Sequence, residues 1–196
     1  MKIFSKASVL GFIVGFIAFP LILWGGAYVY FKIAYSYFEG GGAGLDPPDL
    51  PAEAGVSLDW TVKTLDGVEV NLKDHAGGKA LFLNFWATWC GPCVAELPSI
   101  EKLYSQFGND VVFVCVSNEQ AATIKKFLEV RKFSCPFFVA AADPPKELNT
   151  TAIPATFIIS PEGKILLKHM GGADWGHESV VAFLKEALVR GQGVQG

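Results

Sequence analysis

The run from Phe85 to Cys93, Phe-Trp-Ala-Thr-Trp-Cys-Gly-Pro-Cys, constrains the fold more than any other stretch of this chain. Residues Ala80 to Trp86, which lead into it, are almost all apolar, as is typical of a strand buried on both faces of a parallel sheet. Residues Val94 to Phe107, which follow it, repeat with helical periodicity. A strand that leads directly into a helix predicts that Cys90 lies at the helix N-terminus.

This position favours thiol chemistry at Cys90. Unpaired backbone N–H groups and the helix dipole stabilise a thiolate at a helix N-terminus. Cys93 lies one turn further along the helix, where it is close enough to form a disulfide and is shielded by the strand. The sequence therefore predicts a redox-active disulfide in which Cys90 is the nucleophile and Cys93 is the resolving thiol.

The same Cys-x-x-Cys spacing also occurs in zinc sites, which need a second pair of ligands. Cys115 and Cys135 each lie alone in an apolar run, and the three histidines, His75, His169 and His177, are scattered along the chain. No second ligand pair accompanies the motif. We therefore expect a redox centre with no metal and no cofactor.

Two motifs carry a resemblance to a known family. Trp89-Cys90-Gly91-Pro92-Cys93, preceded by Phe-Trp-Ala, resembles the thioredoxin active site, and Ile153-Pro154-Ala155-Thr156 resembles the cis-proline loop of thioredoxins. In that family the cis-proline loop faces the dithiol and pairs with the substrate backbone. The resemblance implies substrate contacts at Trp89, Gly91, Pro92, Ile153 and Pro154.

The remaining pattern follows the order of elements in a thioredoxin fold. An Asp66-Gly67 turn predicts a hairpin of type I′, and alternating strand and helix patterns after the dithiol indicate βαβ units with a parallel sheet. The expected strands are Leu58 to Thr64, Val68 to Leu72, Val111 to Val116, Phe137 to Ala141, Thr156 to Ser160 and Lys164 to His169, and the expected further helices are Ala121 to Lys132 and Glu178 to Val189.

The N-terminal part of the chain has a different character. Ala7 to Phe31 is apolar apart from one serine, and 25 helical residues would span about 37 Å, more than the roughly 30 Å of a bilayer core. A cleaved signal peptide is the alternative, but the run is long for one and lacks a clear cleavage site. We expect a cytoplasmic tail at 1–6, a transmembrane helix at 7–31, a flexible Gly- and Pro-rich linker at 32–55 and a thioredoxin-like domain at 56–196.

Charge predicts the orientation of this span. Lys2 and Lys6 precede it, whereas the residues that follow Lys32 as far as residue 55 carry only acidic charges. The positive-inside rule then leaves the N-terminus in the cytoplasm. We expect a single-pass protein of the cytoplasmic (inner) membrane with its thioredoxin-like domain in the periplasm or extracytoplasmic space.

The expected fold class is α/β: a thioredoxin fold with an N-terminal β-hairpin and an inserted αβ unit, Gln120 to Ala141, preceded by a single transmembrane helix. This arrangement is similar to the TlpA/ResA/DsbE group of extracytoplasmic thioredoxins, over about Leu58 to Val189. The resemblance implies reduction of disulfides in protein substrates, such as apocytochrome c or metal-site cysteines, with a membrane thiol transporter as electron donor.

Glu96 is the third candidate catalytic residue. A helical projection at about 100° per residue places it on the apolar side with Cys93 and places Ser99 on the opposite side. A buried carboxyl tuned toward neutral pH can exchange protons with a thiol. The alternative is that Glu96 lies at the edge of the apolar side and reaches water. The sequence Cys-x-x-Cys-x-x-Glu also occurs in the ResA-like group, where that Glu is implicated at the active site.

Four other residues carry expectations of their own. Asn84 corresponds to a buried aspartate of cytosolic thioredoxins, and we expect it to be a hydrogen-bonded core amide. Cys115 and Cys135 pair in one interpretation, but we favour two buried thiols because sequence does not show their Cα atoms to be within bonding range. Trp175 is expected in a loop.

Other functions fit the sequence less well. A disulfide oxidase or isomerase would use the same dithiol. Isomerases of this fold usually carry a dimerisation domain, and none is visible in the sequence. A Cu(I)-handling module would be favoured by methionines and histidines beside the thiols, but Met1 and Met170 are the only methionines. A net charge of −3 gives no indication of nucleic-acid binding.

Overall fold

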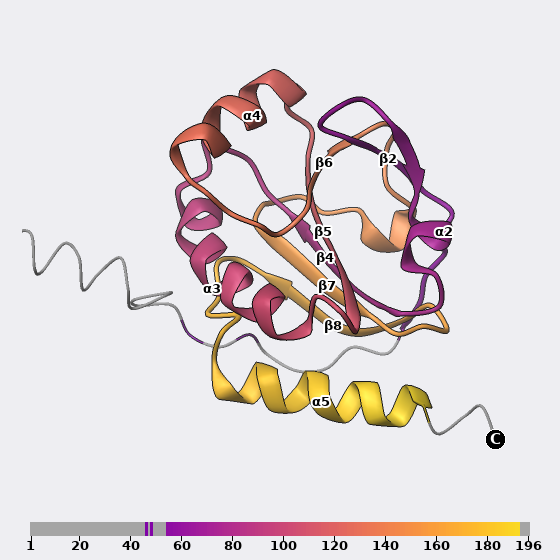
Figure 1. Ribbon diagram of the computed structural model, residues 1–196. Coiled ribbons are helices and arrows are strands. Elements are labelled where there is room, and N and C mark those ends of the chain that lie inside the picture. Colours follow the sequence, from indigo (N-terminus) through magenta and orange to yellow (C-terminus); the bar gives the residue numbers. More distant parts are fainter. Residues whose placement is uncertain (1–45, 47, 49–53, 193–196) are drawn as a thin grey trace, which may run out of the picture. The chain divides into compact units, whose positions relative to one another are not determined.

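The structure is a computed structural model that describes residues 46, 48 and 54–192 (Figure 1). The predicted cytoplasmic tail and transmembrane helix, and most of the predicted linker, lie outside the described residues. Within the described part of the chain, no helix is both long enough and apolar enough to cross a membrane.

The described residues form one mixed sheet with helices on both faces. The strands are β1 Ala54–Gly55, β2 Thr61–Thr64, β3 Glu69–Asn71, β4 Ala80–Phe85, β5 Val111–Ser117, β6 Phe137–Ala140, β7 Ala155–Ile159 and β8 Lys164–Met170. The helices are α2 Leu72–Ala76, α3 Gly91–Phe107, α4 Ala121–Val130, the 3₁₀-helix η1 Lys146–Leu148 and α5 Glu178–Gln192. The spatial order of the strands is β1-β8-β7-β4-β5-β6-β2-β3.

The sheet confirms the predicted thioredoxin-like topology. β4, β5 and β6 pair in parallel, and β7 and β8 form an antiparallel hairpin that pairs with β4 on its other side. α4 and β6 form the predicted inserted αβ unit, and β2 and β3 form the predicted N-terminal hairpin. The central strand β4 is thus flanked by strands on both sides, as its apolar sequence predicts.

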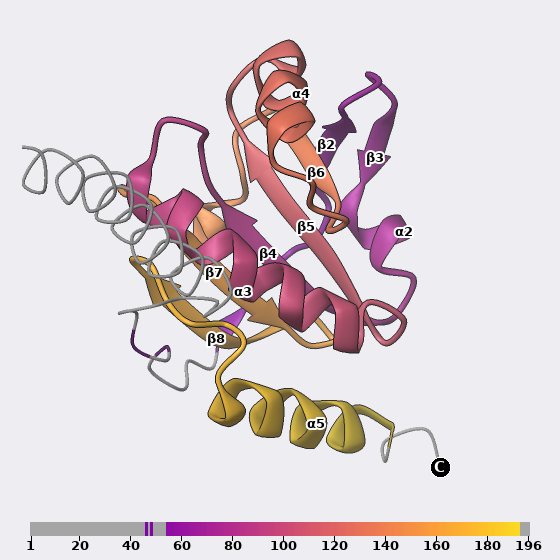
Figure 2. The same cartoon turned by 60° about the vertical axis from the view of Figure 1, so that its left-hand side comes forward.

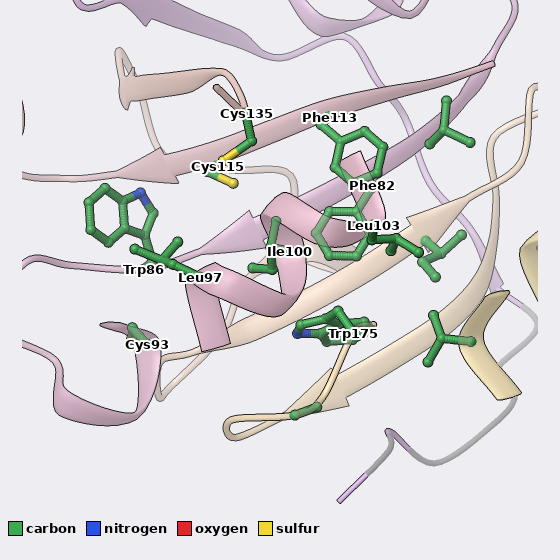
Figure 3. Packing of buried hydrophobic residues seen from close by; sticks show 14 of the residues in the cluster. Phe82, Trp86, Cys93, Leu97, Ile100, Leu103, Phe113, Cys115, Cys135 and Trp175 are labelled. Atoms are coloured by element: carbon green, nitrogen blue, oxygen red, sulfur yellow. The ribbon is translucent and has the colours of Figure 1, made fainter. Parts of the chain in front are cut away.

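Each face of the sheet has its own hydrophobic core. On one face, Phe82 and Phe113 of the sheet pack with apolar residues of α3, α4 and α5. On the other, alternate residues of the same strands pack with Trp60, with Leu72 of α2 and with Leu148 of η1. Figure 2 shows α3 crossing the central strands, and Figure 3 shows its buried side chains Leu97, Ile100 and Leu103. This packing fixes the N-terminal end of α3 at the end of β4.

The β2–β3 hairpin forms where the sequence predicts it, but the predicted type I′ turn is wrong. A type I′ turn needs positive φ at both central residues. Gly67 has φ +87°, whereas no described non-glycine residue, Asp66 included, has positive φ. Gly67 N donates to Thr64 O at 2.9 Å, and Thr64 N donates to Val68 O at 2.8 Å. The loop therefore has three residues and ends on the glycine, which alone takes the left-handed conformation.

Element boundaries differ from the sequence-based expectation at several places. Leu72, expected at the end of a strand, begins the short helix α2, because the Asn71 side chain caps it by accepting from Lys73 N at 3.0 Å. Helix α4 ends at Val130 rather than Lys132. Ala54 and Gly55, at the end of the predicted linker, form β1 and pair with β8.

Candidate active site

Cys90 is the N-cap residue of α3. Its backbone is extended, with φ −83° and ψ 104°, so the chain that leaves β4 at Phe85 enters the helix after a short connection. Pro92 in the first turn is tolerated because a backbone N–H there has no partner within the helix. Cys90 Sγ accepts a hydrogen bond from Cys93 N at 3.3 Å. The sulfur therefore lies where the helix N-terminus favours negative charge.

Cys90 and Cys93 form a disulfide, with their Cα atoms 5.2 Å apart. Cys90 is 6% exposed and Cys93 is fully buried, while the neighbouring Trp89 is 72% exposed. An incoming sulfur can therefore approach Cys90 more readily than Cys93. This asymmetry agrees with the order of roles that the sequence predicts.

The predicted proline loop faces the dithiol. The Ile153–Pro154 peptide bond is cis. Ile153 O lies 3.8 Å from Cys90 Sγ, although the two residues are 63 positions apart in the chain. Pro154 O accepts from Gly171 N at 2.8 Å, which ties the loop to the segment after β8. The two motifs on which the resemblance rests thus meet at one point of the surface.

A groove of about 540 Å³ opens beside this point. Its lining includes Trp86, Trp89 and Ile153, together with polar residues of the segment between β6 and β7: Asp143, Asn149, Thr150 and Thr151. Gly91 and Pro92 are exposed at the start of α3. Of the five residues predicted to contact substrate, Trp89 and Ile153 thus line the groove, Gly91 and Pro92 follow Cys90 directly, and Pro154 follows Ile153.

Glu96 is fully buried on the face of α3 that also carries Cys93. Its Oε1 accepts from Asn84 Nδ2 at 2.8 Å, and its Oε2 accepts from Trp175 Nε1 at 3.0 Å and from Ala173 N at 3.1 Å. The alternative in which Glu96 reaches water is therefore wrong. The carboxyl group lies within the protein, on a residue one helical turn from Cys93.

The surroundings of Glu96 act on its pKa in opposite directions. Burial raises the pKa of the carboxyl group from 4.5 to about 7, because the charged form loses its hydration. The hydrogen bonds from Trp175, Asn84 and Ala173 favour the charged form and lower the pKa. The outcome is a carboxyl group that exchanges a proton near neutral pH.

Asn84 is the buried, hydrogen-bonded amide that the sequence predicts. Its Nδ2 donates to Glu96 Oε1 and to Thr156 Oγ1, each at 2.8 Å, whereas its Oδ1 has no hydrogen-bond partner among the described residues. Asn84 thus links the central strand both to α3 and to the strand that follows the cis-proline. It also presents a spare acceptor next to the carboxyl group.

Sequence reasoning missed the role of the loop between β8 and α5. Trp175 was expected in a loop, and its backbone lies in one, but its side chain is fully buried and bonds to Glu96. Ser99, expected on the solvent side of α3, is also buried: its Oγ accepts from Trp175 N at 3.0 Å and donates to Glu96 O at 2.7 Å. The available signal was a tryptophan in a glycine-rich loop, because so large an apolar side chain is usually buried.

Glu119 is a second residue that sequence reasoning missed. Its carboxylate accepts from Thr88 N and Thr88 Oγ1, each at 2.7 Å, and from Ser117 Oγ at 3.2 Å. Thr88 is two residues before Cys90 in the chain. The end of β5 thereby holds the segment that presents Trp89 and the dithiol.

Cys115 and Cys135 are free and buried, as favoured from the sequence. Cys115 N donates to Pro136 O at 3.1 Å, and Figure 3 shows the two sulfur atoms next to one another. The hydrogen bond with the Cys115 thiol, together with burial and the Glu101 carboxylate, raises the pKa of Cys135. The Cys135 thiol therefore stays protonated near neutral pH. Across residues 46, 48 and 54–192, no cluster of three or more His, Cys, Asp or Glu side chains could hold a metal ion.

Comparison with known proteins gives consistent matches. Residues 56–168 match the AhpC/TSA family. Over 117 residues the chain is 33% identical to the thioredoxin-like protein YneN of Bacillus subtilis, covering 58% of this chain and 68% of YneN. Over 144 residues it is 30% identical to the thiol-disulfide oxidoreductase ResA of Bacillus cereus, covering 71% of this chain and 80% of ResA.

Solved structures match the fold in the same way. A protein from Chlorobium tepidum described as a thiol:disulfide interchange protein DsbE matches with a TM-score of 0.57 and 24% identity, over 74% of this chain and 99% of that one. The thioredoxin domain of a thiol-disulfide oxidoreductase from Bacteroides vulgatus matches with a TM-score of 0.56 and 26% identity, over 69% and 99%.

Proposed function

The chain belongs to the AhpC/TSA family and to the TlpA/ResA/DsbE group of thiol:disulfide oxidoreductases, and from this membership we propose that it reduces disulfides of protein substrates outside the cytoplasm. The observation that carries the proposal is the Cys90–Cys93 disulfide at the start of α3, with its more exposed sulfur facing the cis-proline loop. Reduction by this dithiol needs no cofactor.

In the proposed reaction the reduced dithiol donates two electrons and two protons. The Cys90 thiolate attacks one sulfur of the substrate disulfide, the substrate S–S bond breaks, and the released substrate thiolate takes up a proton. Cys93 then loses its proton and attacks Cys90 Sγ in the mixed disulfide. The second substrate thiolate leaves and is protonated, and Cys90 and Cys93 are left as a disulfide.

Glu96 is proposed to take up the proton that Cys93 loses. Its position one turn from Cys93 and a pKa raised by burial to about 7 support this role. Asn84 supports it as well, because its unpartnered Oδ1 can accept from a protonated Glu96 after the amide turns over, whereas its Nδ2 donates to the ionised form. Both protonation states of the carboxyl group are therefore hydrogen-bonded inside the core.

The reducing direction is proposed from the residues between the cysteines. Gly91 and Pro92 carry no charge, and Pro92 has no N–H, so one backbone donor that would stabilise a Cys90 thiolate is missing. A couple with a strongly stabilised thiolate is oxidising, as in DsbA. A moderate thiolate at Cys90 therefore supports a reducing couple.

The proposed substrate is an extended protein segment that carries a disulfide, such as the cysteine pair of apocytochrome c or of a metal site. Trp89, Gly91, Pro92, Ile153 and Pro154 would contact it, because Trp89 and Ile153 line the groove, Gly91 and Pro92 follow Cys90 directly, and Pro154 follows Ile153, whose carbonyl oxygen lies 3.8 Å from Cys90 Sγ. The specific substrate class comes from the resemblance to the TlpA/ResA/DsbE group.

Location and electron supply are part of the same proposal. Residues 7–31 would anchor the chain in the inner membrane, with residues 56–196 on the extracytoplasmic side. Reducing equivalents on that side must come from within the cell, and a membrane thiol transporter is the proposed donor.

Trapping of mixed disulfides tests this function. Replacing Cys93 with serine removes the resolving thiol, so Cys90 should accumulate disulfides with natural substrates, which mass spectrometry identifies. The control is the Cys90→Ser, Cys93→Ser double variant, in which these species should vanish. Isolation of the wild-type dithiol fully oxidised, with a potential near those of disulfide oxidases, would replace the reductase assignment with the oxidase one.

A further inference from the structure

The Glu96 carboxylate is held mainly by one loop. Its Oε2 accepts from two groups of the segment between β8 and α5, Trp175 Nε1 at 3.0 Å and Ala173 N at 3.1 Å. Its Oε1 accepts from Asn84 Nδ2 at 2.8 Å. Two of the three donors therefore come from a segment that is more than 70 residues away in the chain.

The indole that makes one of these bonds is rigidly placed. Trp175 is fully buried and packs edge-on against Phe82, with ring centroids 5.1 Å apart. Its backbone N–H donates to Ser99 Oγ at 3.0 Å, and Ser99 lies on the same helix as Glu96. Figure 3 shows the Trp175 ring beside α3. Core packing and a second hydrogen bond thus fix the direction of the indole N–H.

We propose that Trp175 is a positioning residue of the thiol:disulfide exchange: its indole N–H holds the carboxylate of Glu96, one helical turn from Cys93, and sets the pH at which Glu96 exchanges its proton. The inference rests on the proposed role of Glu96. A neutral donor to a buried carboxylate stabilises the ionised form without adding charge to the core. The loop between β8 and α5 thereby tunes the dithiol through Glu96.

Other groups that carry a charge or titrate also face this cluster. Cys93 lies on α3 itself, and Asn84 and Thr156 approach from β4 and β7 as neutral groups. His169 of β8 packs edge-on against the Trp175 ring, with centroids 5.9 Å apart. The Asp174 carboxylate accepts from Gly176 N in its own loop at 3.0 Å. A test must therefore separate Glu96 from His169, because histidine side chains in general can change charge between pH 5 and 8.

The test is Trp175→Phe, which keeps an aromatic ring but removes the N–H. In reduced full-length protein, the rate of Cys alkylation by iodoacetamide is followed from pH 5 to pH 9, and the Glu96 carboxyl carbon is followed by NMR in parallel. Loss of one hydrogen bond to the carboxylate should move the Glu96 titration upward by about one pH unit. The alkylation profile should move with it.

Trp60→Phe is the matched control. Trp60 is also buried and also donates its Nε1–H, at 3.0 Å to Ala142 O, but it belongs to the core on the other face of the sheet. Its replacement should lower stability without moving the Glu96 titration. In a Glu96→Gln background, Trp175→Phe should leave the alkylation profile where it is, which excludes His169 as the source of the shift.

The outcomes separate the two claims. An unchanged Glu96 titration in folded Trp175→Phe protein, or an equal shift with Trp60→Phe, overturns the role of Trp175. An alkylation profile that is the same in Glu96→Gln and wild-type protein overturns the proposed role of Glu96 instead. Should Trp175→Phe fail to fold, β-(3-benzothienyl)alanine is placed at position 175, where it replaces the N–H with sulfur at nearly constant shape. The Glu96 titration of this variant is then judged by the same outcomes.

Discussion

The four cysteines of this chain form two pairs with opposite properties. Cys90 and Cys93 lie at the start of α3, where a backbone N–H points at Cys90 Sγ and the neighbouring Trp89 is exposed. Cys115 and Cys135 lie in and just before neighbouring strands, buried, without a helix N-terminus. The same side chain thus serves in chemistry at one place and in packing at the other.

The difference lies in what surrounds the sulfur atoms. Helix N–H groups and the dipole favour a thiolate at Cys90. At Cys135 the neighbouring thiol, burial and the Glu101 carboxylate raise the pKa, so the reactive thiolate is suppressed. Glu101 also accepts from Cys135 N at 2.9 Å, which holds this carboxylate beside the second pair. Backbone position and nearby charge, rather than cysteine content, determine which pair is reactive.

The largest expected effect is the difference in activity between a variant of the first cysteine pair and a variant of the second. Cys90→Ser removes the proposed nucleophile and should reduce the rate of insulin disulfide reduction to that of dithiothreitol alone. The Cys115→Ala, Cys135→Ala double variant should keep the wild-type rate and lose roughly 1–2 kcal/mol of unfolding free energy, because only packing is removed. Loss of activity in a folded double variant would show that the buried pair takes part in the reaction.

A second prediction concerns Glu96, the fully buried carboxyl group on the same helix as Cys93. The pKa of Glu96 rises from 4.5 in the unfolded chain to about 7 in the folded protein, so the folded state holds a proton that the unfolded state releases between these values. The free energy of unfolding should therefore fall by about 3 kcal/mol as the pH rises from 4.5 to 7. Above pH 7, Glu96 should cause no further loss of stability.

Chemical denaturation at a series of pH values measures this effect. In Glu96→Gln the contribution should be absent, so the difference in unfolding free energy between variant and wild type should grow in favour of the variant as the pH rises to 7. The glutamine can be accommodated, because Asn84 Oδ1 is free to accept from its amide. A difference that stays constant with pH would mean that Glu96 does not carry the buried proton.

The sequence predicted the parts of the site that depend on short-range patterns. The apolar run of β4, the Cys-x-x-Cys spacing and the i, i+3 relation of Cys93 to Glu96 each lie within a few residues. The cis-proline loop followed from its resemblance to a known motif, and the structure confirms its place beside Cys90.

The missed parts depend on long-range contacts. Trp175 and Glu96 are 79 residues apart, and only the path of β8 and of the loop that follows it brings them together. Ser99 faces what would be solvent on an isolated helix and is buried because that loop covers it. Glu119 gave no local signal, because its partner Thr88 lies on another segment. Helical projection cannot account for elements that pack on the far side of a helix.

Pulse alkylation of the folded protein tests the contrast between the two cysteine pairs most directly. Reduced protein is exposed briefly to iodoacetamide near neutral pH, digested and analysed by mass spectrometry for each cysteine. We predict rapid modification of Cys90, slower modification of Cys93, and none of Cys115 or Cys135 until denaturant is added. Modification of Cys115 or Cys135 in the folded protein as fast as that of Cys90 would contradict the account.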